Sequence, residues 1–249
     1  MKKLIAIMLA MLLVLGLVAC GEEKAPKETE PVVTDPVETD PVEGEEEVAV
    51  MTWEEYMAAD MESEVVVECY VQGHQSWWDN KITVYAQDDN GGYFMYEMAC
   101  EEADAEKLVP GTKIRVSGVK TAWEGEVEII EATFEIIEGD TKVYEAEDVT
   151  ALLGTDELIN KQNMLVAFNG VTLKEVSYKN DEPGDDIYVT VTYEDADYSF
   201  CVERYLTDPE TEVYKAFESL EAGAVVNIEG FAYWYQGINT HITAIAVAE

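Results

Sequence analysis

Histidine is nearly absent from this chain of 249 residues, which contains only His74 and His241. The two are far apart in the sequence, and neither has a cysteine or a second histidine at the spacing of a zinc site. We therefore expect both to be surface or packing residues, and we expect no metal ion or other cofactor. The acidic turns at 88–90 and 180–186 lack the alternating oxygen spacing of a calcium loop. We interpret them as solvated hairpin tips.

The sequence also lacks the short motifs that carry catalytic chemistry. It has no Gly-x-Ser-x-Gly elbow, no Walker loop, no Rossmann glycine pattern and no His-Glu-x-x-His pair. Carboxylates are so numerous that a pair of them is uninformative, and a glycosidase needs two that face each other across a cleft. We therefore predict no catalytic residue and no enzyme, and we keep a carbohydrate-active enzyme as a third hypothesis.

Basic residues are few: 15 Lys and Arg stand against 53 Asp and Glu, and the formal net charge is −38. The excess is spread along the chain, with a net charge of −9 in residues 20–50, −16 in 51–146 and −15 in 147–249. Nucleic-acid affinity comes largely from Lys and Arg that neutralise phosphates. We therefore expect no nucleic-acid partner, and we interpret the charge as a solvated acidic surface that favours solubility.

No apolar run reaches the length of about 20 residues that a transmembrane helix needs. The run at 4–18 follows the basic residues Lys2 and Lys3, as in the apolar part of a signal peptide. It ends in Leu17-Val18-Ala19-Cys20, and this end resembles a bacterial lipobox. The resemblance implies a signal peptide over 1–19, a diacylglycerol on Cys20, and a lipid-anchored place on the outer side of the cell membrane. An ordinary secretory signal that carries a cysteine is the alternative.

An acidic, proline-rich tether is expected at 20–50. Proline recurs at every fifth position, at Pro31, Pro36 and Pro41, which disfavours both helices and sheet ladders. Like charges extend such a chain. We predict a disordered spacer between the membrane and the folded part.

Three cysteines remain after Cys20, namely Cys69, Cys100 and Cys201. An odd number outside the cytosol leaves at least one without a partner in the chain. We expect buried free thiols, because cysteine packs like a small apolar residue. A bridge between Cys69 and Cys100 stays open as an alternative.

The folded part contains an internal repeat in which nine residues return 112 positions later without a gap. Glycines at fixed offsets among alternating apolar residues are typical of a turn, a strand and a hairpin that are used twice. The pairs are Leu108 and Leu220, Gly111 and Gly223, Ile114 and Val226, Val116 and Ile228, Gly118 and Gly230, Trp123 and Tyr235, Gly125 and Gly237, Ile130 and Ile242, and Ala132 and Ala244.

Residues 51–141 resemble an OB-fold, a five-stranded barrel. We expect a helix behind a capping box at Thr52 that runs to about Met61. We further expect strands at 65–71, 82–87 and 93–98, a short helix at 101–108, and strands at 112–119 and 126–137. This element order, over about 63–137, carries the resemblance.

Residues 142–249 repeat the same order with longer loops. Val166 echoes Val65 at an offset of 101, and Ile187 echoes Ile82 at an offset of 105. We expect a short strand in the connector 142–150, a helical turn at 156–160, and a helix from 207–209 to 220. The predicted fold class is therefore mainly β, with two tandem five-stranded OB-like barrels, each with short helices, over 51–141 and 142–249.

The resemblance also implies a ligand face on strands 2 and 3 and the loops beside them. Aromatic side chains near this face would stack on a ligand. Trp77 and Trp78 are adjacent, so on an extended chain they point to opposite sides and at least one should be exposed. The alternative is that the tyrosines simply fill the barrels. The candidate binding residues are Trp77, Trp78, Tyr93, Tyr96 and Trp234, with Tyr85, Tyr188 and Tyr198 near the same faces.

These patterns favour a membrane-anchored, extracytoplasmic lipoprotein that binds a protein or a glycan without catalysis. The expected partners are the membrane, through lipidated Cys20, and a protein or glycan ligand. A structural or accessory subunit of a cell-envelope complex, without a small ligand, is the second hypothesis. The ligand, the oligomeric state and the packing of the two halves are left open by the sequence, because a fold does not determine a function.

Overall fold

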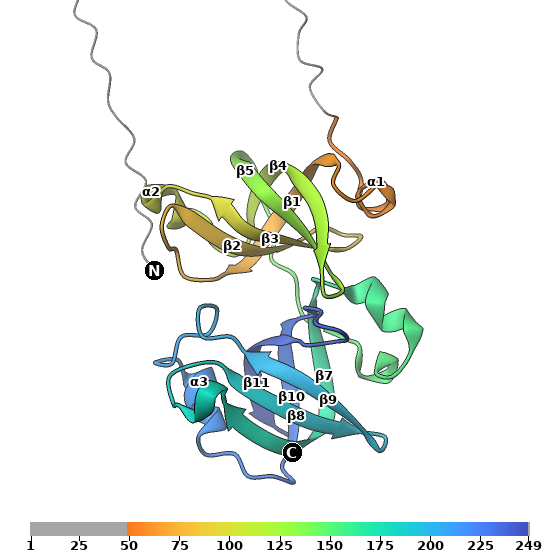
Figure 1. Cartoon of the computed structure of the whole chain (residues 1–249), viewed down its shortest axis with the longest axis vertical. Helices are drawn as coiled ribbons and strands as arrows, with labels where there is room; N and C mark the ends of the chain where they lie inside the picture. The colour runs from red at the N-terminus through yellow and green to blue at the C-terminus, as the bar shows by residue number, and fades with distance from the viewer. Residues whose placement is uncertain (1–48, 249) are drawn as a thin grey trace, which may run out of the picture. The chain divides into compact units, whose positions relative to one another are not determined.

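The structure is a computed structural model that describes residues 49–248 (Figure 1). The predicted signal peptide at 1–19, the lipid site at Cys20 and nearly all of the tether at 20–50 lie outside the described residues, so they stay predictions. In the described part of the chain, no helix is long and apolar enough to cross a membrane.

Five strands close into a barrel in the first half of the chain. They pair in the order β1-β2-β3-β5-β4, and β4 pairs back onto β1. Inward positions of β1 alternate as the sequence predicts, and Val65, Val67 and Cys69 are fully buried. The expected five-stranded barrel is confirmed, although its last strand is longer than predicted. The strands are β1 (Glu64–His74), β2 (Lys81–Gln87), β3 (Gly92–Ala99), β4 (Thr112–Trp123) and β5 (Glu126–Thr141).

Helix α1 (Trp53–Ala58) begins at the predicted capping box. The Oγ1 of Thr52 accepts a hydrogen bond from the Glu55 N–H at 3.2 Å, and the Thr52 N–H donates to the Glu55 carboxylate at 2.8 Å. The helix ends before Met61 because the buried Lys120 ammonium donates hydrogen bonds to the carbonyl groups at the C-terminal end of the helix. Lys120 Nζ donates to the carbonyl oxygens of Tyr56, Met57 and Ala59, at 2.8–2.9 Å.

Helix α2 (Glu102–Ala105) is shorter than the predicted 101–108 and follows the third strand, as in the expected order. Ala105 and Leu108 pack into the barrel core. The three cysteines within residues 49–248, Cys69, Cys100 and Cys201, are free and buried, so the bridge between Cys69 and Cys100 is not formed. Burial raises the pKa of the Cys69 thiol well above its ordinary value, which leaves it an inert packing residue.

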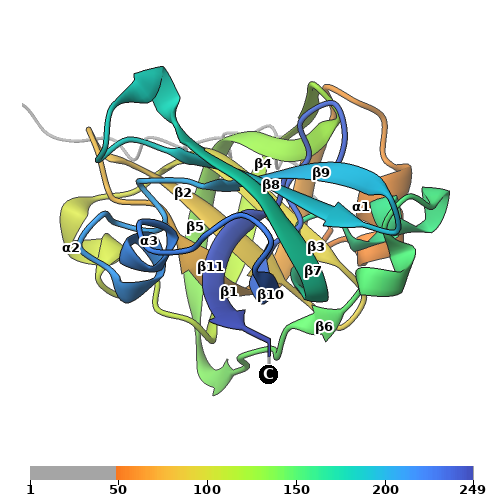
Figure 2. The same cartoon turned by 90° about the horizontal axis from the view of Figure 1, so that it is seen from below.

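The second half forms a sheet in the order β10-β11-β9-β8-β7-β6. Strand β10 also pairs with β7, and Figure 2 shows these two strands side by side. Apart from β6, each strand therefore has the same neighbours as its counterpart in the first barrel. The elements are β6 (Glu147–Asp148), the 3-10 helices η1 (Thr150–Leu152), η2 (Asp156–Lys161) and η3 (Lys179–Asp181), β7 (Leu165–Tyr178), β8 (Ile187–Tyr193), β9 (Ala196–Val202), α3 (Glu212–Phe217), β10 (Val225–Phe231) and β11 (His241–Val247).

Helix α3 starts later than predicted. Its N-cap is Thr211, whose side chain accepts a hydrogen bond from the Tyr214 N–H at 3.2 Å. The carboxylate of Asp208 instead accepts from the Glu210 N–H at 2.8 Å and closes a separate turn. Tyr214 and Phe217 are buried, as the predicted stripe requires. The start at 207–209 was wrong because an acidic residue before proline is typical of a turn as well as of a helix.

The repeated glycines Gly118 and Gly230 occupy matching places. Gly118 in β4 lies opposite Val65 of β1, and Gly230 in β10 lies opposite Val166 of β7. Each also sits at a register shift against the next strand. A Cβ on Gly118 would lie 2.6 Å from the Ile129 side chain, and one on Gly230 would lie 2.3 Å from the His241 carbonyl oxygen. Only glycine fits this close approach, so the repeat reflects one local geometry used twice.

Candidate functional site

A layer of aromatic rings joins the first barrel to the second sheet, and we call this contact the seam. Tyr85 of β2 and Phe94 of β3 are buried outside the barrel core and pack against Phe231 of β10. The rings of Tyr85 and Phe231 stack with centroids 4.4 Å apart. The β2–β3 face is the usual ligand face of an OB-fold. In this chain, much of that face is covered by the second half.

The seam contains a buried tyrosine–histidine hydrogen bond. Tyr85 Oη lies 2.6 Å from His241 Nδ1, and it accepts a hydrogen bond from Gln75 Nε2 at 3.2 Å. The imidazole tautomer decides which of the two atoms, Tyr85 Oη or His241 Nδ1, donates in this bond. Burial lowers the pKa of His241 to about 3. The expectation that His241 is a packing residue is confirmed.

A buried carboxyl lies at the edge of the seam. Glu126 is fully buried, and its Oε2 accepts a hydrogen bond from the Trp234 N–H at 2.7 Å. Its Oε1 and the Oδ1 of Asn163 are buried without a hydrogen-bond partner. Burial raises the pKa of Glu126 to about 8. This carboxyl therefore fixes the 232–240 loop while keeping its proton at neutral pH.

Beside the seam lies an open groove of about 660 Å³, which we call the seam groove. Both halves of the chain contribute to it. The loop at 75–78 and strands β2 and β3 form one wall, and residues 204–209 form the other. A volume of this size is typical of small-molecule sites. The lining residues are Gln75, Ser76, Trp77, Trp78, Lys81, Ile82, Thr83, Tyr96, Glu97, Arg204, Tyr205, Asp208 and Pro209.

The two tryptophans of the first wall have different roles. Trp77 is half-buried, packs against the barrel core and donates from Nε1 to the Cys100 carbonyl at 2.8 Å. Trp78 is 77% exposed. A tight turn at Asp79 and Asn80, both at positive φ, returns the chain so that the Trp78 and Lys81 backbones pair. The prediction that at least one tryptophan is exposed is confirmed.

The second wall is built on the carboxylate of Glu203. One carboxylate oxygen accepts hydrogen bonds from the N–H groups of Tyr205, at 3.1 Å, and Leu206, at 2.8 Å. Burial raises the pKa of Glu203 to about 7. The Tyr205 carbonyl then accepts from the Ser76 N–H at 2.7 Å, which joins the two walls. The Tyr205 ring is left 54% exposed.

The charges in the seam groove largely balance. Lys81 Nζ lies 2.6 Å from a carboxylate oxygen of Glu97. The Arg204 guanidinium lies over the Tyr205 ring, 5.1 Å from its centroid. Asp208 adds a second carboxylate to the lining. Apolar ring faces with few net charges favour a planar, weakly charged ligand.

The structure brings together three of the five candidate residues, Trp77, Trp78 and Tyr96. Tyr93 is a core residue instead: it is fully buried, and its hydroxyl donates to Asp88 at 2.8 Å. The prediction that Tyr93 lies on the ligand face was wrong, because the aromatic residues of β3 alternate between the core and the surface. Trp234 is half-buried at the edge of the seam, where its ring packs on Gly125.

Sequence reasoning missed Arg204 and Tyr205. The repeat aligns the strands of the two halves but gives no signal that a loop after β9 reaches the first barrel. The adjacent Arg-Tyr pair in an acidic chain was the available hint.

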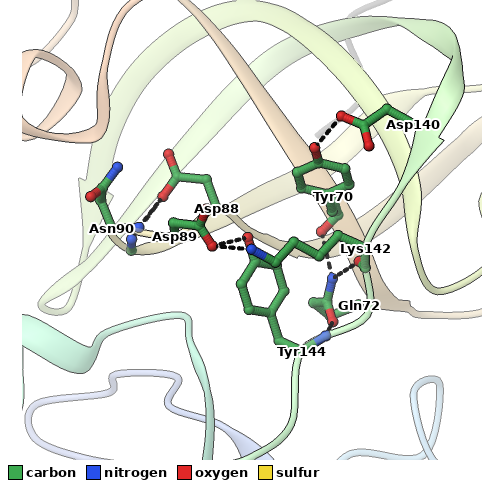
Figure 3. Close-up of polar contacts among 9 residues, drawn as sticks. Tyr70, Gln72, Asp88, Asp89, Asn90, Asp140, Lys142 and Tyr144 are labelled. Carbon is green, nitrogen blue, oxygen red and sulfur yellow. Dashed lines mark hydrogen bonds and ion pairs between the residues drawn. The ribbon is translucent and has the colours of Figure 1, made fainter.

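A second polar cluster holds the connector between the halves (Figure 3). Gln72 is buried on β1, where its Nε2 donates to the Lys142 carbonyl at 3.2 Å and its Oε1 accepts from the Tyr144 N–H at 2.9 Å. Lys142 and Tyr144 also reach the carboxylate of Asp89. The 88–90 turn was expected to be a solvated tip. Asp89 and Asn90 are exposed, as expected, and Asp89 also binds the connector through these two partners.

No family model and no curated protein matches this chain. Among solved structures, it is similar to a murine DNA-binding protein bound to double-stranded DNA, with a TM-score of 0.35 and 10% identity over 74% of this chain and 96% of that one. It is also similar to p202 HIN1 in complex with a 12-mer double-stranded DNA, with a TM-score of 0.33 and 10% identity over 76% and 94%. A replication protein A heterotrimer bound to single-stranded DNA gives a TM-score of 0.29 and 14% identity over 72% and 50%.

These findings correct the expected function and partners. We expected a membrane-anchored module for a protein or a glycan, or else an envelope subunit or a carbohydrate-active enzyme, and we excluded nucleic acid. The similar solved structures are described as DNA-binding proteins or DNA complexes. The exclusion rested on the net charge of each segment, and that charge does not describe the lining of one groove, where two basic and two acidic residues balance. Stacking on a base needs a ring face rather than a cation.

Proposed function

We propose that the folded part of the chain binds single-stranded nucleic acid, without catalysis, by stacking an unpaired base in the seam groove. The observation that carries this proposal is the set of three exposed rings around one groove, Trp78, Tyr96 and Tyr205. Every base has a π-face, and stacking on an aromatic side chain contributes about 1–3 kcal/mol per base. The groove is open to solvent, whereas Tyr85 and Phe94 are not.

The proposal includes a duplicated OB-like barrel. The matching strand neighbours, the β10–β7 pairing and the matching places of Gly118 and Gly230 support this interpretation. The second barrel would then act partly as a cover for the β2–β3 face of the first. The groove that remains draws on both barrels, so neither alone would form it.

Binding of a fluorescein-labelled oligothymidylate of about ten nucleotides, a length within the range that OB-folds occupy, tests the proposal. Fluorescence anisotropy with the full chain should show saturable binding. Trp78→Ala and Tyr205→Ala should each weaken it about tenfold, as the loss of one stacking ring predicts. Trp123→Ala is the matched control, because Trp123 is 52% exposed on β4 outside the groove. Equal affinity of Trp78→Ala and the unaltered chain would refute the site.

A further inference from the structure

The lining of the seam groove offers the phosphates of a bound strand no net positive charge. The lining contains two basic residues, Lys81 and Arg204, and two acidic residues, Glu97 and Asp208. Lys81 is held by Glu97 at 2.6 Å, so it is not free to neutralise a phosphate. Beyond the groove, both halves carry a large negative charge, −16 over 51–146 and −15 over 147–249.

We infer that the seam groove takes the uncharged base of a strand end or of a free nucleoside, and that it excludes the phosphate backbone. This inference rests on the proposed function and names the ligand class of the same site. Trp78, Tyr96 and Tyr205 supply the attraction through their ring faces. Glu97 and Asp208, together with the acidic surface, supply the discrimination, because like charges repel most strongly where solvent is partly excluded.

The sign of the salt dependence follows from this arrangement. A protein that binds nucleic acid through Lys and Arg releases counterions, and its affinity falls steeply as salt rises. Here the long-range electrostatic interaction between the acidic protein and the phosphates is repulsive. Salt shortens the range of this repulsion from about 30 Å at 0.01 M to about 10 Å at 0.1 M. The affinity of the full chain for oligothymidylate should therefore stay constant or rise with salt.

A phosphate series measures the discrimination directly. Thymidine, thymidine monophosphate and thymidine triphosphate should compete with the labelled oligothymidylate in decreasing order of affinity. We expect thymidine to bind at least several-fold more tightly than the triphosphate. The same series at 0.01 M and 0.2 M NaCl should show the difference shrinking as salt rises.

Glu97→Gln separates charge from stacking. It removes one carboxylate from the lining and frees Lys81, so the affinity for the triphosphate and the strand should rise a few-fold, whereas the affinity for thymidine should not change. Glu175→Gln is the matched control. It removes an equal charge from an exposed position on β7, away from the groove, and should leave all affinities nearly unaltered.

The outcomes distinguish the two proposals. Binding that depends on Trp78, with thymidine favoured and no loss of affinity at higher salt, supports both. Binding that depends on Trp78 but favours the triphosphate and falls steeply with salt overturns the inference and leaves the proposed function standing. No binding of any of these ligands by the full chain overturns the proposed function and the inference with it.

Discussion

The hydroxyl of Tyr85 and the Nδ1 of His241 lie 2.6 Å apart, although 156 positions separate the two residues in the chain. Both are buried between the first barrel and the second sheet. The hydrogen bond therefore makes the packing of one half depend on an atom of the other. Removing the Tyr85 hydroxyl is a direct way to measure that dependence.

Tyr85→Phe should lower the free energy of unfolding by about 1–3 kcal/mol, because it leaves the buried Nδ1 of His241 without its hydrogen-bond partner. Urea unfolding followed by circular dichroism measures the change. Tyr188→Phe is the control, since Tyr188 is exposed on β8 and should cost almost nothing. A Tyr85→Phe chain as stable as the control would show that the bond contributes nothing to the seam.

Glu126→Gln should remove a pH dependence of stability. The pKa of Glu126 is about 8 in the folded chain and near 4.5 when unfolded, so the folded state binds more protons between these values. Stability from this group therefore falls as pH rises from about 4.5 to 8. The glutamine stays neutral and keeps an oxygen for the Trp234 N–H, so the variant should gain most over the unaltered chain at pH 8.

Thermal unfolding of both chains at pH 5, 6.5 and 8 checks this prediction. The difference between them should grow with pH. A constant difference would mean that Glu126 does not change its protonation in this range.

Lys120→Met should destabilise the first barrel by roughly 1.5–3 kcal/mol, the usual contribution of hydrogen bonds to a charged group. The substitution keeps the apolar stem and leaves the carbonyls of Tyr56, Met57 and Ala59, at the end of α1, without this donor. Hydrogen exchange at α1 should rise by more than exchange at β8, which has no contact with Lys120. Uniform exchange in both elements would contradict a local role in ending the helix.

Gln72→Leu should release the connector. The leucine keeps the bulk of the side chain but removes the hydrogen bonds to Lys142 and Tyr144. Limited trypsin digestion should then cut after Lys142 several times faster than in the unaltered chain. Cleavage after Lys179, which is remote from Gln72 in the sequence, serves as an internal control in the same digest. Unchanged cleavage after Lys142 would show that the ion pair with Asp89 alone holds the connector.

The sequence predicted the barrel well because its signals are local. Gly111 and Gly223 adopt φ of +94° and +95°, and each donates its N–H to a carbonyl of the first strand of its half, Val71 and Leu173 respectively, at 2.7 Å. A side chain strains this conformation, so the turn requires glycine. The position of the glycine in the sequence therefore predicts the turn. The same holds for the capping box at Thr52.

The site could be predicted only in part, because it depends on contacts between distant segments. Trp78 and Tyr96 follow from their places on one barrel. Tyr205 joins them through its contact with Ser76, which no periodicity encodes. Tyr93 was misplaced because alternation predicts two faces without saying which one is covered. The lipobox at Cys20 stays a prediction, since it lies outside the described residues.

A fragment that stops after the connector would present the rings of Tyr85 and Phe94 to water. Exposed apolar patches of this kind promote self-association, so such a fragment should aggregate or pair with itself unless the complementary fragment is supplied. The aromatic rings of the seam would then hold two separately expressed fragments together. The chain is therefore a candidate for a split reporter, in which reassembly of the fragments buries the Tyr85 ring again.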